Sequence, residues 1–597
     1  MQENFRLFDC LEYQLSNFPL EVTMAAKIND SWTTYNTKAI VDIVNQLSIS
    51  LWNLGLTGND MNVESADKIA IISNNRPEWL MADLAIQQIG CILVPLYPTT
   101  SSSEIQFILQ EAQVKCIFVS DQILADKIIA LQPQLPNLKH IISFDKLNQI
   151  KYWKDILFEC KETELEQLKQ YKSFIPNTHI ATIIFTSGTT GVPKGVMLSH
   201  QNIVTNIKAV KECLPFDEGI NYKILSFLPL NHIFEKLACY VYLFCGMSIY
   251  FAESIEKFGA NLLEVKPNIF TCVPRLLEKL YEKIMTKGYE LTGIKKKLFF
   301  WAVSLEKHFE YNKTYSWWIG LQIKIARKLI FSKWQQALGG QVKFLITGGA
   351  PCQPRLLRLF NLANIPIYEG YGPTENSPVI TVNQRRQGFA KIGTVGLPIS
   401  NTTVKITDEG EIICKGTSVM QGYYKRPDLT AETVIDGWLY TGDIGEWVDG
   451  KFLKITDRKK QLLKTSGGKY VAPQPIENKY KESIYIEQIM VIGDGRKFVS
   501  ALILPNFEKL INYLNKNNIH TTTAKNEIVK LPEVVALFQR EIDKFSEIFN
   551  HVEQIKKFVL LTKEWSVETG ELTPKLSLKR KDILLKYAPE IEKMYAE

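Results

Sequence analysis

Apolar runs and amphipathic stretches alternate in the first part of the chain. From Lys68 the apolar run KIAIIS is followed by the amphipathic stretch RPEWLMADLAIQQIG, and CILVPLY, SSEIQFILQEAQ and KCIFVSD continue the alternation. Short apolar runs of this kind are typical of buried strands, and stretches with apolar residues three and four positions apart are typical of helices. The order strand, helix, strand, helix, strand predicts a parallel sheet covered by helices.

A second block repeats the alternation more loosely, at residues 247–253, 261–274, 341–351 and 364–375. We therefore expect two α/β halves. The longest apolar run, residues 237–252, is shorter than the roughly 20 residues that cross a bilayer and contains polar breaks. We predict that this run forms a buried helix followed by a core strand.

The pattern changes after about Gly393, where short strand-and-turn segments such as TVKITDEGEIICKG indicate a β-rich subdomain. Beyond Asp457 come a basic, glycine-containing loop, the alternating strands IEQIMVIGDGRKFVSALILP, and helices to the end. Single cores stop growing near roughly 250 to 300 residues, so a chain of 597 residues has at least two domains. The sequence predicts an α/β protein with a large N-terminal domain, residues 1–459, of two α/β parallel-sheet subdomains plus the β-rich subdomain. Residues 460–597 are predicted to form a small α+β C-terminal domain.

Composition and charge exclude several classes of protein. The ten cysteines include no C-x-x-C spacing, so neither a zinc site nor a disulfide framework is indicated. The net charge of +7 suits anionic ligands or a membrane surface, and no zinc-finger spacing or RNA-binding aromatic signature points to nucleic acid. The first residues lack the apolar run of a signal peptide, which favours a cytoplasmic location.

One stretch, FTSGTTGVPKG at residues 185–195, has the composition of a phosphate-binding loop. Its glycines expose backbone N–H groups, and Lys194 adds a positive charge. Hydroxyl donors come from Thr186, Ser187, Thr189 and Thr190. The alternative is a surface turn rich in glycine and threonine, and composition alone does not name a reaction.

The stretch does not match the P-loop pattern G-x-x-x-x-G-K-[ST]. Counted from Gly188, the sixth residue is Pro193, and Lys194 is followed by Gly195. A P-loop kinase or GTPase is therefore disfavoured.

Taken with five further motifs, this loop resembles the signature of the adenylate-forming enzymes, which include acyl-CoA synthetases, luciferases and peptide-synthetase adenylation domains. The further motifs occur in that family's order: LPLNHIFEK (228–236), ITGGAP (346–351), YGPTE (371–375), YTGDIG (440–445) and DRKKQLLKTSGGKYVAPQPIE (457–477). The resemblance implies a two-step reaction. A carboxylate attacks the α-phosphate of ATP to give acyl-AMP and pyrophosphate, and the thiol of CoA then attacks the acyl carbon.

The resemblance also implies the phosphate and metal contacts. The β- and γ-phosphates would lie on the loop that contains Thr186, Ser187, Gly188, Thr189, Thr190 and Lys194. Thr374 would contact the α-phosphate, and Glu375 would bind Mg²⁺, a cation that prefers oxygen ligands.

The nucleoside and the acyl group would contact other motifs. Gly348, Gly349 and Ala350 would leave room for the flat adenine, on which Tyr371 would stack, and Gly372 would also belong to the ATP site. Asp443 would accept hydrogen bonds from the ribose hydroxyls, supported by Arg458. The resemblance places His232 near the acyl pocket; a structural or exposed histidine is the alternative.

The C-terminal segment ELTPKLSLKRKDI, residues 571–583, is where the family carries the lysine that bridges the acyl carboxylate and the α-phosphate. The common P-x-T-x-x-G-K pattern is broken here, and in the long-chain pattern LTPTxKxKR the first lysine falls on Ser577 and the second on Lys579. We predict Lys579 as this lysine. Lys575 and Lys581 are alternatives, as is a basic run in solvent.

The resemblance further implies that the C-terminal domain is mobile and rotates between the two half-reactions. Lys460 would be the hinge. Gly467, Gly468 and Lys469 would then line the passage for the pantetheine arm of CoA.

Several features resemble the long-chain fatty-acid branch: LPLNHIFEK, the stretch at 266–284 and an inserted helical segment at about 298–338. Two rivals stay open, an acyl-AMP ligase that loads a carrier protein and an inactive lipid-binding paralogue. In the insertion, a helix would place Trp318, Leu321, Ile325 and Leu329 on one face, flanked or opposed by Lys324, Arg327 and Lys328. Such a helix either lies peripherally on the inner face of an anionic membrane or packs on its own domain.

Overall fold

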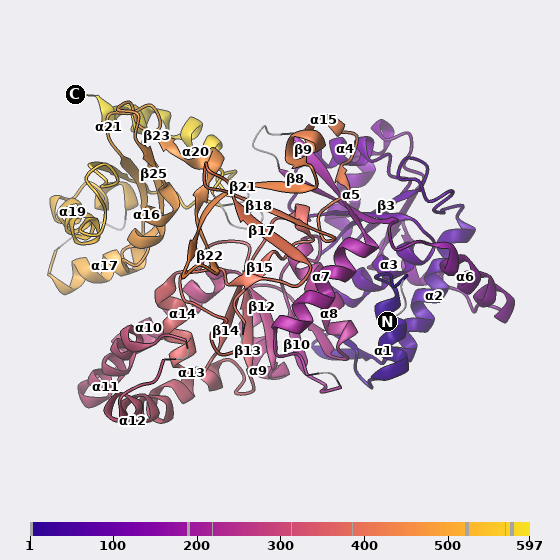
Figure 1. Ribbon diagram of the computed structural model, residues 1–597, viewed down its shortest axis with the longest axis horizontal. Helices are drawn as coiled ribbons and strands as arrows, with labels where there is room; N and C mark the ends of the chain where they lie inside the picture. The colour runs from indigo at the N-terminus through magenta and orange to yellow at the C-terminus, as the bar shows by residue number, and fades with distance from the viewer. Residues whose placement is uncertain are drawn as a thin grey trace. The chain divides into compact units, whose positions relative to one another are not determined.

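The computed structural model describes residues 4–187, 192–217, 219–311, 313–384, 386–519, 524–566, 569–572 and 578–596 (Figure 1). The chain forms two compact units. Unit 1 comprises Met1–Lys405, Ile413–Tyr440 and Asp449–Leu453, and unit 2 comprises Ile406–Ile412, Thr441–Val448 and Lys454–Glu597.

The first sheet of unit 1 has eight strands in the order β19-β9-β8-β4-β3-β5-β6-β7. Their bounds are β3 (Lys68–Ile72), β4 (Ile92–Leu96), β5 (Cys116–Val119), β6 (His140–Ser143), β7 (Lys151–Tyr152), β8 (Ile180–Ser187), β9 (Pro193–Ser199) and β19 (Gly422–Tyr423). Strands β3, β4 and β5 are parallel, and α3 (Pro77–Gln88) and α4 (Ser102–Glu111) connect them. The alternation predicted from Lys68 onwards is therefore confirmed.

The second sheet has nine strands in the order β16-β15-β14-β13-β12-β10-β11-β1-β2. Their bounds are β1 (Met24–Ile28), β2 (Ser31–Tyr35), β10 (Lys223–Ser226), β11 (Ser248–Phe251), β12 (Ile269–Cys272), β13 (Phe344–Thr347), β14 (Ile367–Tyr371), β15 (Thr381–Val382) and β16 (Leu397–Pro398). Neighbouring strands from β11 to β14 are parallel. The apolar run at 237–252 forms most of the buried helix α8 (Ile233–Phe244) and then β11, so both the second α/β half and this helix are confirmed.

The remaining helices of unit 1 lie around the two sheets, with α6 at one margin and α11, α12 and α13 at another (Figure 1). They are α1 (Asp9–Asn17), α2 (Thr37–Asn53), α5 (Gln122–Leu131), α6 (Glu162–Phe174), α7 (His200–Cys213), α9 (Phe258–Val265), α10 (Pro274–Glu290), α11 (Gly293–Ser304), α12 (Trp317–Ala326), α13 (Ser332–Ala337), α14 (Pro354–Leu362) and α15 (Pro427–Thr433). A π-helical turn, η4 (Arg327–Phe331), joins α12 to α13.

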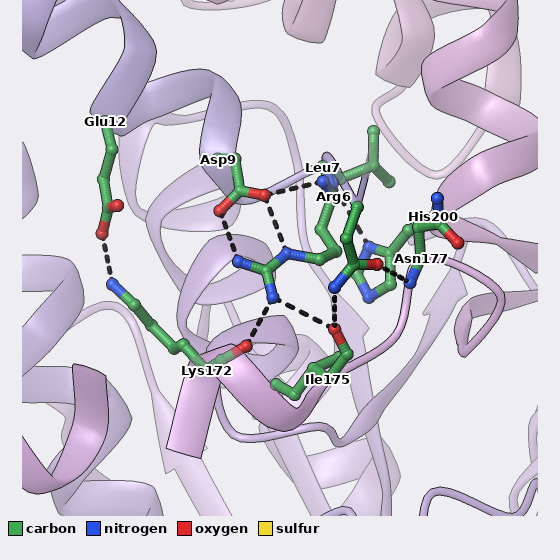
Figure 2. A network of polar contacts seen from close by, with 9 residues as sticks. Arg6, Leu7, Asp9, Glu12, Lys172, Ile175, Asn177 and His200 are labelled. Carbon is green, nitrogen blue, oxygen red and sulfur yellow. Dashed lines mark hydrogen bonds and ion pairs between the residues drawn. The ribbon is translucent and has the colours of Figure 1, made fainter. Parts of the chain in front are cut away.

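Residues near the N-terminus form hydrogen bonds with the end of α6 and the segment between α6 and β8 (Figure 2). The Arg6 guanidinium donates to the Asp9 carboxylate at 2.8 and 3.0 Å and to the carbonyl oxygens of Lys172 and Ile175 at 2.5 and 3.0 Å. The Leu7 N–H donates to Nδ1 of His200 at 3.3 Å. Since residues 172–177 lead directly into β8, these contacts fix the strand whose far end begins the phosphate loop.

Unit 2 has a hydrophobic core of its own. A three-stranded sheet contains β25 (Ile486–Ile492), β26 (Ser500–Pro505) and β27 (Lys557–Leu560), and β23 (Leu463–Lys464) pairs with β24 (Tyr470–Val471). Its helices are α16 (Pro473–Tyr480), α17 (Phe507–Lys516), α18 (Lys525–Ile528), α19 (Pro532–Ser546), α20 (Arg580–Lys586) and α21 (Ala588–Tyr595). The predicted α+β character of this region is confirmed.

The segment between the two main regions is β-rich, as predicted. Its strands are β17 (Thr402–Ile406), β18 (Glu411–Gly416), β20 (Val434–Ile435), β21 (Trp438–Val448) and β22 (Phe452–Arg458). Parts of these strands belong to unit 1 and parts to unit 2. The domain boundary between residues 459 and 460 therefore stays a prediction.

Candidate active site

The described ends of the predicted phosphate loop belong to two paired strands. Strands β8 and β9 are antiparallel, and their register places Thr186 opposite Lys194 and Ser187 opposite Pro193. A P-loop instead connects a strand to a helix, so the pairing of β8 with β9 also disfavours that class. Gly188, Thr189 and Thr190 lie outside the described residues.

Two of the predicted site residues meet at a tyrosine that the sequence analysis did not identify. The hydroxyl of Tyr423 donates to Oε1 of Glu375 at 2.8 Å, and Nζ of Lys194 lies over the Tyr423 ring, 4.9 Å from its centroid. Burial and the Glu375 carboxylate raise the pKa of Tyr423 well above its usual range, so its hydroxyl keeps the proton that it donates. Tyr423 thus orients the carboxylate and supports the lysine. The only signal in the sequence was a pair of tyrosines in QGYYK.

The turn that carries Thr374 and Glu375 is fixed by asparagines. Thr374 is buried, and the turn continues into Asn376, which is fully buried. The side-chain amide of Asn206, on α7, donates to the carbonyl oxygens of Asn376 and Val379 at 3.3 and 2.9 Å. The Asn376 amide donates to the Val379 carbonyl oxygen at 2.8 Å. The sequence motifs did not indicate either asparagine. Both bind backbone carbonyl oxygens, and those that Asn206 binds are distant in sequence.

Gly372 in the same motif has a clear steric reason. A Cβ at this position would lie 1.7 Å from the carbonyl oxygen of Pro378. Any other residue would push the two backbone segments apart. The fold therefore requires glycine at position 372, in addition to the role beside the nucleotide that the sequence predicts.

The predicted adenine wall lies at the carboxyl ends of β13 and β14, which are parallel and adjacent. Gly349 and Ala350 are exposed, and Tyr371 is half-buried. A Cβ on Gly348 would lie 3.2 Å from the carbonyl oxygen of Gly370, so glycine permits this close approach. Ligands of open α/β sheets bind at this edge, outside the carboxyl ends of the strands.

Glu369, on β14, joins the two adenine-side motifs and was not predicted. Its Oε1 accepts a hydrogen bond from the N–H of Cys352 at 3.0 Å, which links β14 to the loop after Gly348 and Gly349. Burial raises the pKa of Glu369 to about 8. An acid within the apolar stretch NIPIYEG was the signal in the sequence.

This carboxyl predicts a pH effect. Because the pKa of Glu369 is higher in the folded chain than in the unfolded chain, its contribution to stability is greatest below the unfolded value and is lost as pH rises towards 8. Glu369→Gln keeps an oxygen acceptor and cannot ionise. Between pH 5.5 and pH 8 we expect its unfolding free energy to rise relative to that of the wild type by roughly a few kcal/mol, which thermal unfolding at the two pH values would measure. Parallel pH dependence in both proteins would contradict this.

His232 is one of the residues that line a pocket. It is the N-cap of α8, and its Nδ1 accepts from the N–H of Phe234 at 3.1 Å. The pocket has a cavity volume of about 60 Å³, and about 660 Å³ of empty space when the open solvent at its entrance is included. Besides His232 and Phe234, its lining consists of Val210, Leu214, Phe216, Leu237, Ala238, Val241, Tyr242, Thr271, Ile346, Thr347, Gly348, Gly349, Gly370, Tyr371, Gly372, Val379 and Val382. The predicted adenine wall and a largely apolar pocket are therefore continuous.

A buried carboxyl stands behind the pocket wall. Glu235 accepts from the hydroxyl of Ser226 at 2.6 Å and from the hydroxyl of Thr271, which lines the pocket. Burial raises the pKa of Glu235 to about 7. Its neighbour Lys236 is also fully buried and pairs with Asp83. The motif LPLNHIFEK therefore supplies structural anchors as well as His232.

The predicted ribose residues both belong to unit 2 and form an ion pair. Nε of Arg458 lies 3.1 Å from Oδ1 of Asp443; the aspartate side chain is 8% exposed and the arginine side chain 65%. The N–H of Asp443 donates to the hydroxyl of Thr441 at 3.1 Å. The aspartate is thus held in place and the arginine head remains accessible.

The backbone at the predicted adenylation lysine, Lys579, is held by hydrogen bonds within unit 2. Lys579 is the half-buried N-cap of α20, and its N–H donates to the carbonyl oxygen of Glu571 at 2.8 Å. The adjacent Arg580 donates to the carbonyl oxygen of Val491 at 3.0 Å and pairs with Glu477. Lys581 is exposed, and Lys575 lies outside the described residues.

The predicted CoA-side residues form the exposed turn between β23 and β24. Gly467, Gly468 and Lys469 are exposed, and Gly468 has a φ of 76°, a conformation that favours glycine. The N–H of Gly468 donates to the carbonyl oxygen of Thr465 at 2.8 Å. Lys460 lies in a short 3₁₀ turn, η6 (Lys459–Gln461).

Glu375 suits the magnesium ion that the predicted reaction needs. Magnesium is commonly held by one or two carboxylates together with substrate phosphates. Within the described part of the chain, no cluster of three or more His, Cys, Asp or Glu side chains offers a metal cage. A single half-buried carboxylate whose Oε1 is already oriented by Tyr423 fits that mode of binding.

No helix among the described residues is long and apolar enough to span a bilayer. The apolar run at 237–252 forms the buried helix and core strand that the sequence predicts.

Comparisons with known proteins agree with the geometry. The family model described as AMP-binding enzyme matches residues 22–424, and the model for the C-terminal domain of AMP-binding enzymes matches residues 460–597. The chain is 29% identical over 574 residues to long-chain-fatty-acid–CoA ligase FadD15 of Mycobacterium bovis, covering 95% of this chain and 93% of the relative. It is 32% identical over 624 residues to long-chain-fatty-acid–CoA ligase 5 of Rattus norvegicus, covering 98% and 86%.

Solved structures share the fold. The adenylation domain of a carboxylic acid reductase from Segniliparus rugosus, in complex with AMP and a carboxylic acid, aligns with a TM-score of 0.72 at 20% identity, covering 100% of this chain and 95% of that one. The anthranilate CoA ligase AuaEII in complex with anthranoyl-AMP also gives a TM-score of 0.72, at 16% identity and 98% coverage of both chains.

Proposed function

Because the chain belongs to the AMP-binding enzyme family, we propose that it is an AMP-forming ligase that joins a fatty acid to CoA. ATP, the acid and CoA are consumed, and acyl-CoA, AMP and pyrophosphate are released. Relatives at about 30% identity over most of the chain bear names of long-chain-fatty-acid–CoA ligases. The observation that carries the proposal is the apolar pocket that opens beside Gly348, Gly349 and Tyr371.

In the first step, a carboxylate oxygen of the acid attacks the α-phosphorus of ATP. The bond from that phosphorus to the pyrophosphate oxygen breaks, and pyrophosphate leaves. Lys194 and the hydroxyl of Thr186 stabilise the negative charge of the leaving group, and Thr374 contacts the α-phosphate. Glu375 would hold Mg²⁺, which neutralises phosphate charge when bound, and Tyr423 keeps the Glu375 carboxylate oriented.

In the second step, the CoA thiol loses its proton and attacks the acyl carbon, and AMP leaves. We propose that the turn at Gly467, Gly468 and Lys469 lines the CoA passage and that Lys460 is the hinge between the half-reactions. Asp443 and Arg458 hold the ribose. Lys579 bridges the acyl carboxylate and the α-phosphate in the first step.

We propose a long-chain acid as substrate and the pocket behind His232 as its binding site. Ala238 lines the pocket from α8. Ala238→Trp should fill part of the pocket and lower kcat/KM for long-chain acids by about 10-fold or more, with a smaller loss for short acids. Pyrophosphate release measured across a series of chain lengths tests this. Ala130→Trp, at an exposed position on α5, is the control, and an equal loss at every chain length would contradict the assignment.

The experiment that tests the function is formation of the thioester by the purified chain with ATP, Mg²⁺ and a fatty acid. Acyl-CoA should accumulate only when CoA is added. Acyl-AMP that accumulates and is not consumed by CoA would favour a ligase that loads a carrier protein, and no product with any acid would favour a lipid-binding paralogue.

A further inference from the structure

Part of the inserted segment presents an unusually apolar surface to solvent. Trp317 is 78% exposed and Trp318 is 56% exposed, and large apolar neighbours on α11, α12 and η4 are exposed as well. We call this the tryptophan surface; its apolar members are Ile294, Leu298, Trp317, Trp318, Leu321, Ile325 and Leu329. Figure 1 shows α11 and α12 near one another at the margin of unit 1.

The tryptophan surface is not needed to hold the segment in place. The opposite sides of the same helices supply buried residues to the core beside the second sheet, among them Phe299 and Ala302 of α11 and Ile323 and Ala326 of α12. The face predicted from Trp318, Leu321, Ile325 and Leu329 is therefore real, and it faces solvent. The alternative, a helix packed on its own domain with its lysines in water, describes the other side of α12, and membrane contact of the exposed face stays a prediction.

Positive charge is concentrated in the same segment. Residues 293–338 contain nine lysines and arginines and two glutamates, a net +7 that equals the net charge of the whole chain. The two glutamates lie beside arginines of α14: Glu306 is 3.7 Å from Arg355, and Glu310 is 2.7 Å from Arg358. Lysines that flank the apolar members are exposed: Lys295, Lys297, Lys324 and Lys328.

These features select one kind of partner. Tryptophan with aliphatic side chains suits the boundary between lipid headgroups and acyl chains, and lysines beside them suit negatively charged headgroups. A second copy of the same surface would bring two strongly positive surfaces together. Exposed leucine and isoleucine offer little to a nucleic acid. We propose that the tryptophan surface docks unit 1 on an anionic lipid bilayer.

Docking does not depend on the chemistry of the active site. Its consequence does rest on the proposed function, because an enzyme held at a bilayer would meet fatty acids where they partition. Binding to vesicles and ligase activity in solution are separate measurements, so the two proposals fail separately.

The test is co-sedimentation of the full chain with vesicles of phosphatidylcholine alone and of phosphatidylcholine mixed with phosphatidylglycerol. We expect binding to the anionic vesicles that weakens as salt is added, because salt screens the lysines. Trp317→Ser combined with Trp318→Ser should reduce the partition coefficient by about 10-fold or more. Lys324→Gln combined with Lys328→Gln should reduce the preference for anionic vesicles.

The matched control is Ile123→Ser combined with Phe174→Ser, two equally exposed apolar side chains on α5 and α6, which should leave vesicle binding unchanged. Circular dichroism and activity on a short, water-soluble acid confirm that the variants fold. No binding to either vesicle, or equal binding by wild type and the tryptophan variant, would overturn the proposal. Loss of concentration-dependent dimerisation in the tryptophan variant would assign the surface to a second copy instead.

Discussion

Replacing Lys579 by alanine is expected to slow acyl-AMP formation by about 100-fold or more and to leave thioester formation from supplied acyl-AMP nearly unchanged. The ammonium group would neutralise charge between the acyl carboxylate and the α-phosphate, which is needed only in the first step. The backbone hydrogen bond to Glu571 and the contacts of Arg580 hold this position, and alanine retains them. Pyrophosphate release and the conversion of synthetic acyl-AMP to acyl-CoA measure the two steps separately.

Lys581→Ala is the matched control. Lys581 lies two residues further along α20 and is exposed, so its loss should change neither step by more than about twofold. Equal losses of both steps in the Lys579 variant would refute its assignment. A selective loss in the Lys581 variant would transfer the role to that residue.

Glu375→Gln is expected to lower acyl-AMP formation by about 100-fold or more and to raise the concentration of Mg²⁺ needed for half-maximal rate. The substitution removes the carboxylate charge that would hold the metal but keeps an oxygen to accept the Tyr423 hydroxyl, so the local structure should persist. Initial rates across a range of Mg²⁺ concentrations, with thermal unfolding to verify the fold, give the measurement.

Asp428→Asn is the control for Glu375→Gln. Asp428 lies shortly after Tyr423 in the sequence and forms an exposed ion pair with Arg426. Replacing its carboxylate by an amide should therefore change neither the rate nor the dependence on Mg²⁺. A Glu375 variant with wild-type dependence on Mg²⁺ would refute the metal assignment. Tyr423→Phe should show a weaker effect in the same direction, because the carboxylate loses its orienting donor but keeps its charge.

The order of strands and helices could be predicted because it rests on local patterns. Runs such as KIAIIS and CILVPLY form fully buried strands, and the stretches after them form α3 and α4, although α3 is buried on every side rather than amphipathic. The domain boundary between residues 459 and 460 does not rest on such a pattern and stays a prediction. Short strands from β17 to β22 are divided between the two compact units, so no single point in the sequence separates them.

The motif residues of the site could be named because they lie together in short stretches. Tyr423, Asn206 and Glu369 could not, because their importance comes from contacts with residues distant in sequence. Tyr423 reaches Glu375 and Lys194 only because β19 pairs with β9. Glu369 matters because a loop from another strand donates to it.

The helix with Trp318 shows a different limit. Its periodicity predicted which residues share a face, but Ile323 and Ala326 on the other face are apolar too. Periodicity alone therefore could not decide which face meets the core. The hydrophobic pattern of the sequence also did not indicate the π-helical turn η4.

The most direct test of the central claim is the exchange of labelled pyrophosphate into ATP, with and without fatty acid, in the absence of CoA. The exchange reports reversible acyl-AMP formation alone. We predict exchange that depends on both the fatty acid and Mg²⁺, that is strongest with long-chain acids, and that falls to background in the Glu375→Gln variant. No exchange with any fatty acid would contradict the claim that this chain activates fatty acids as acyl-adenylates.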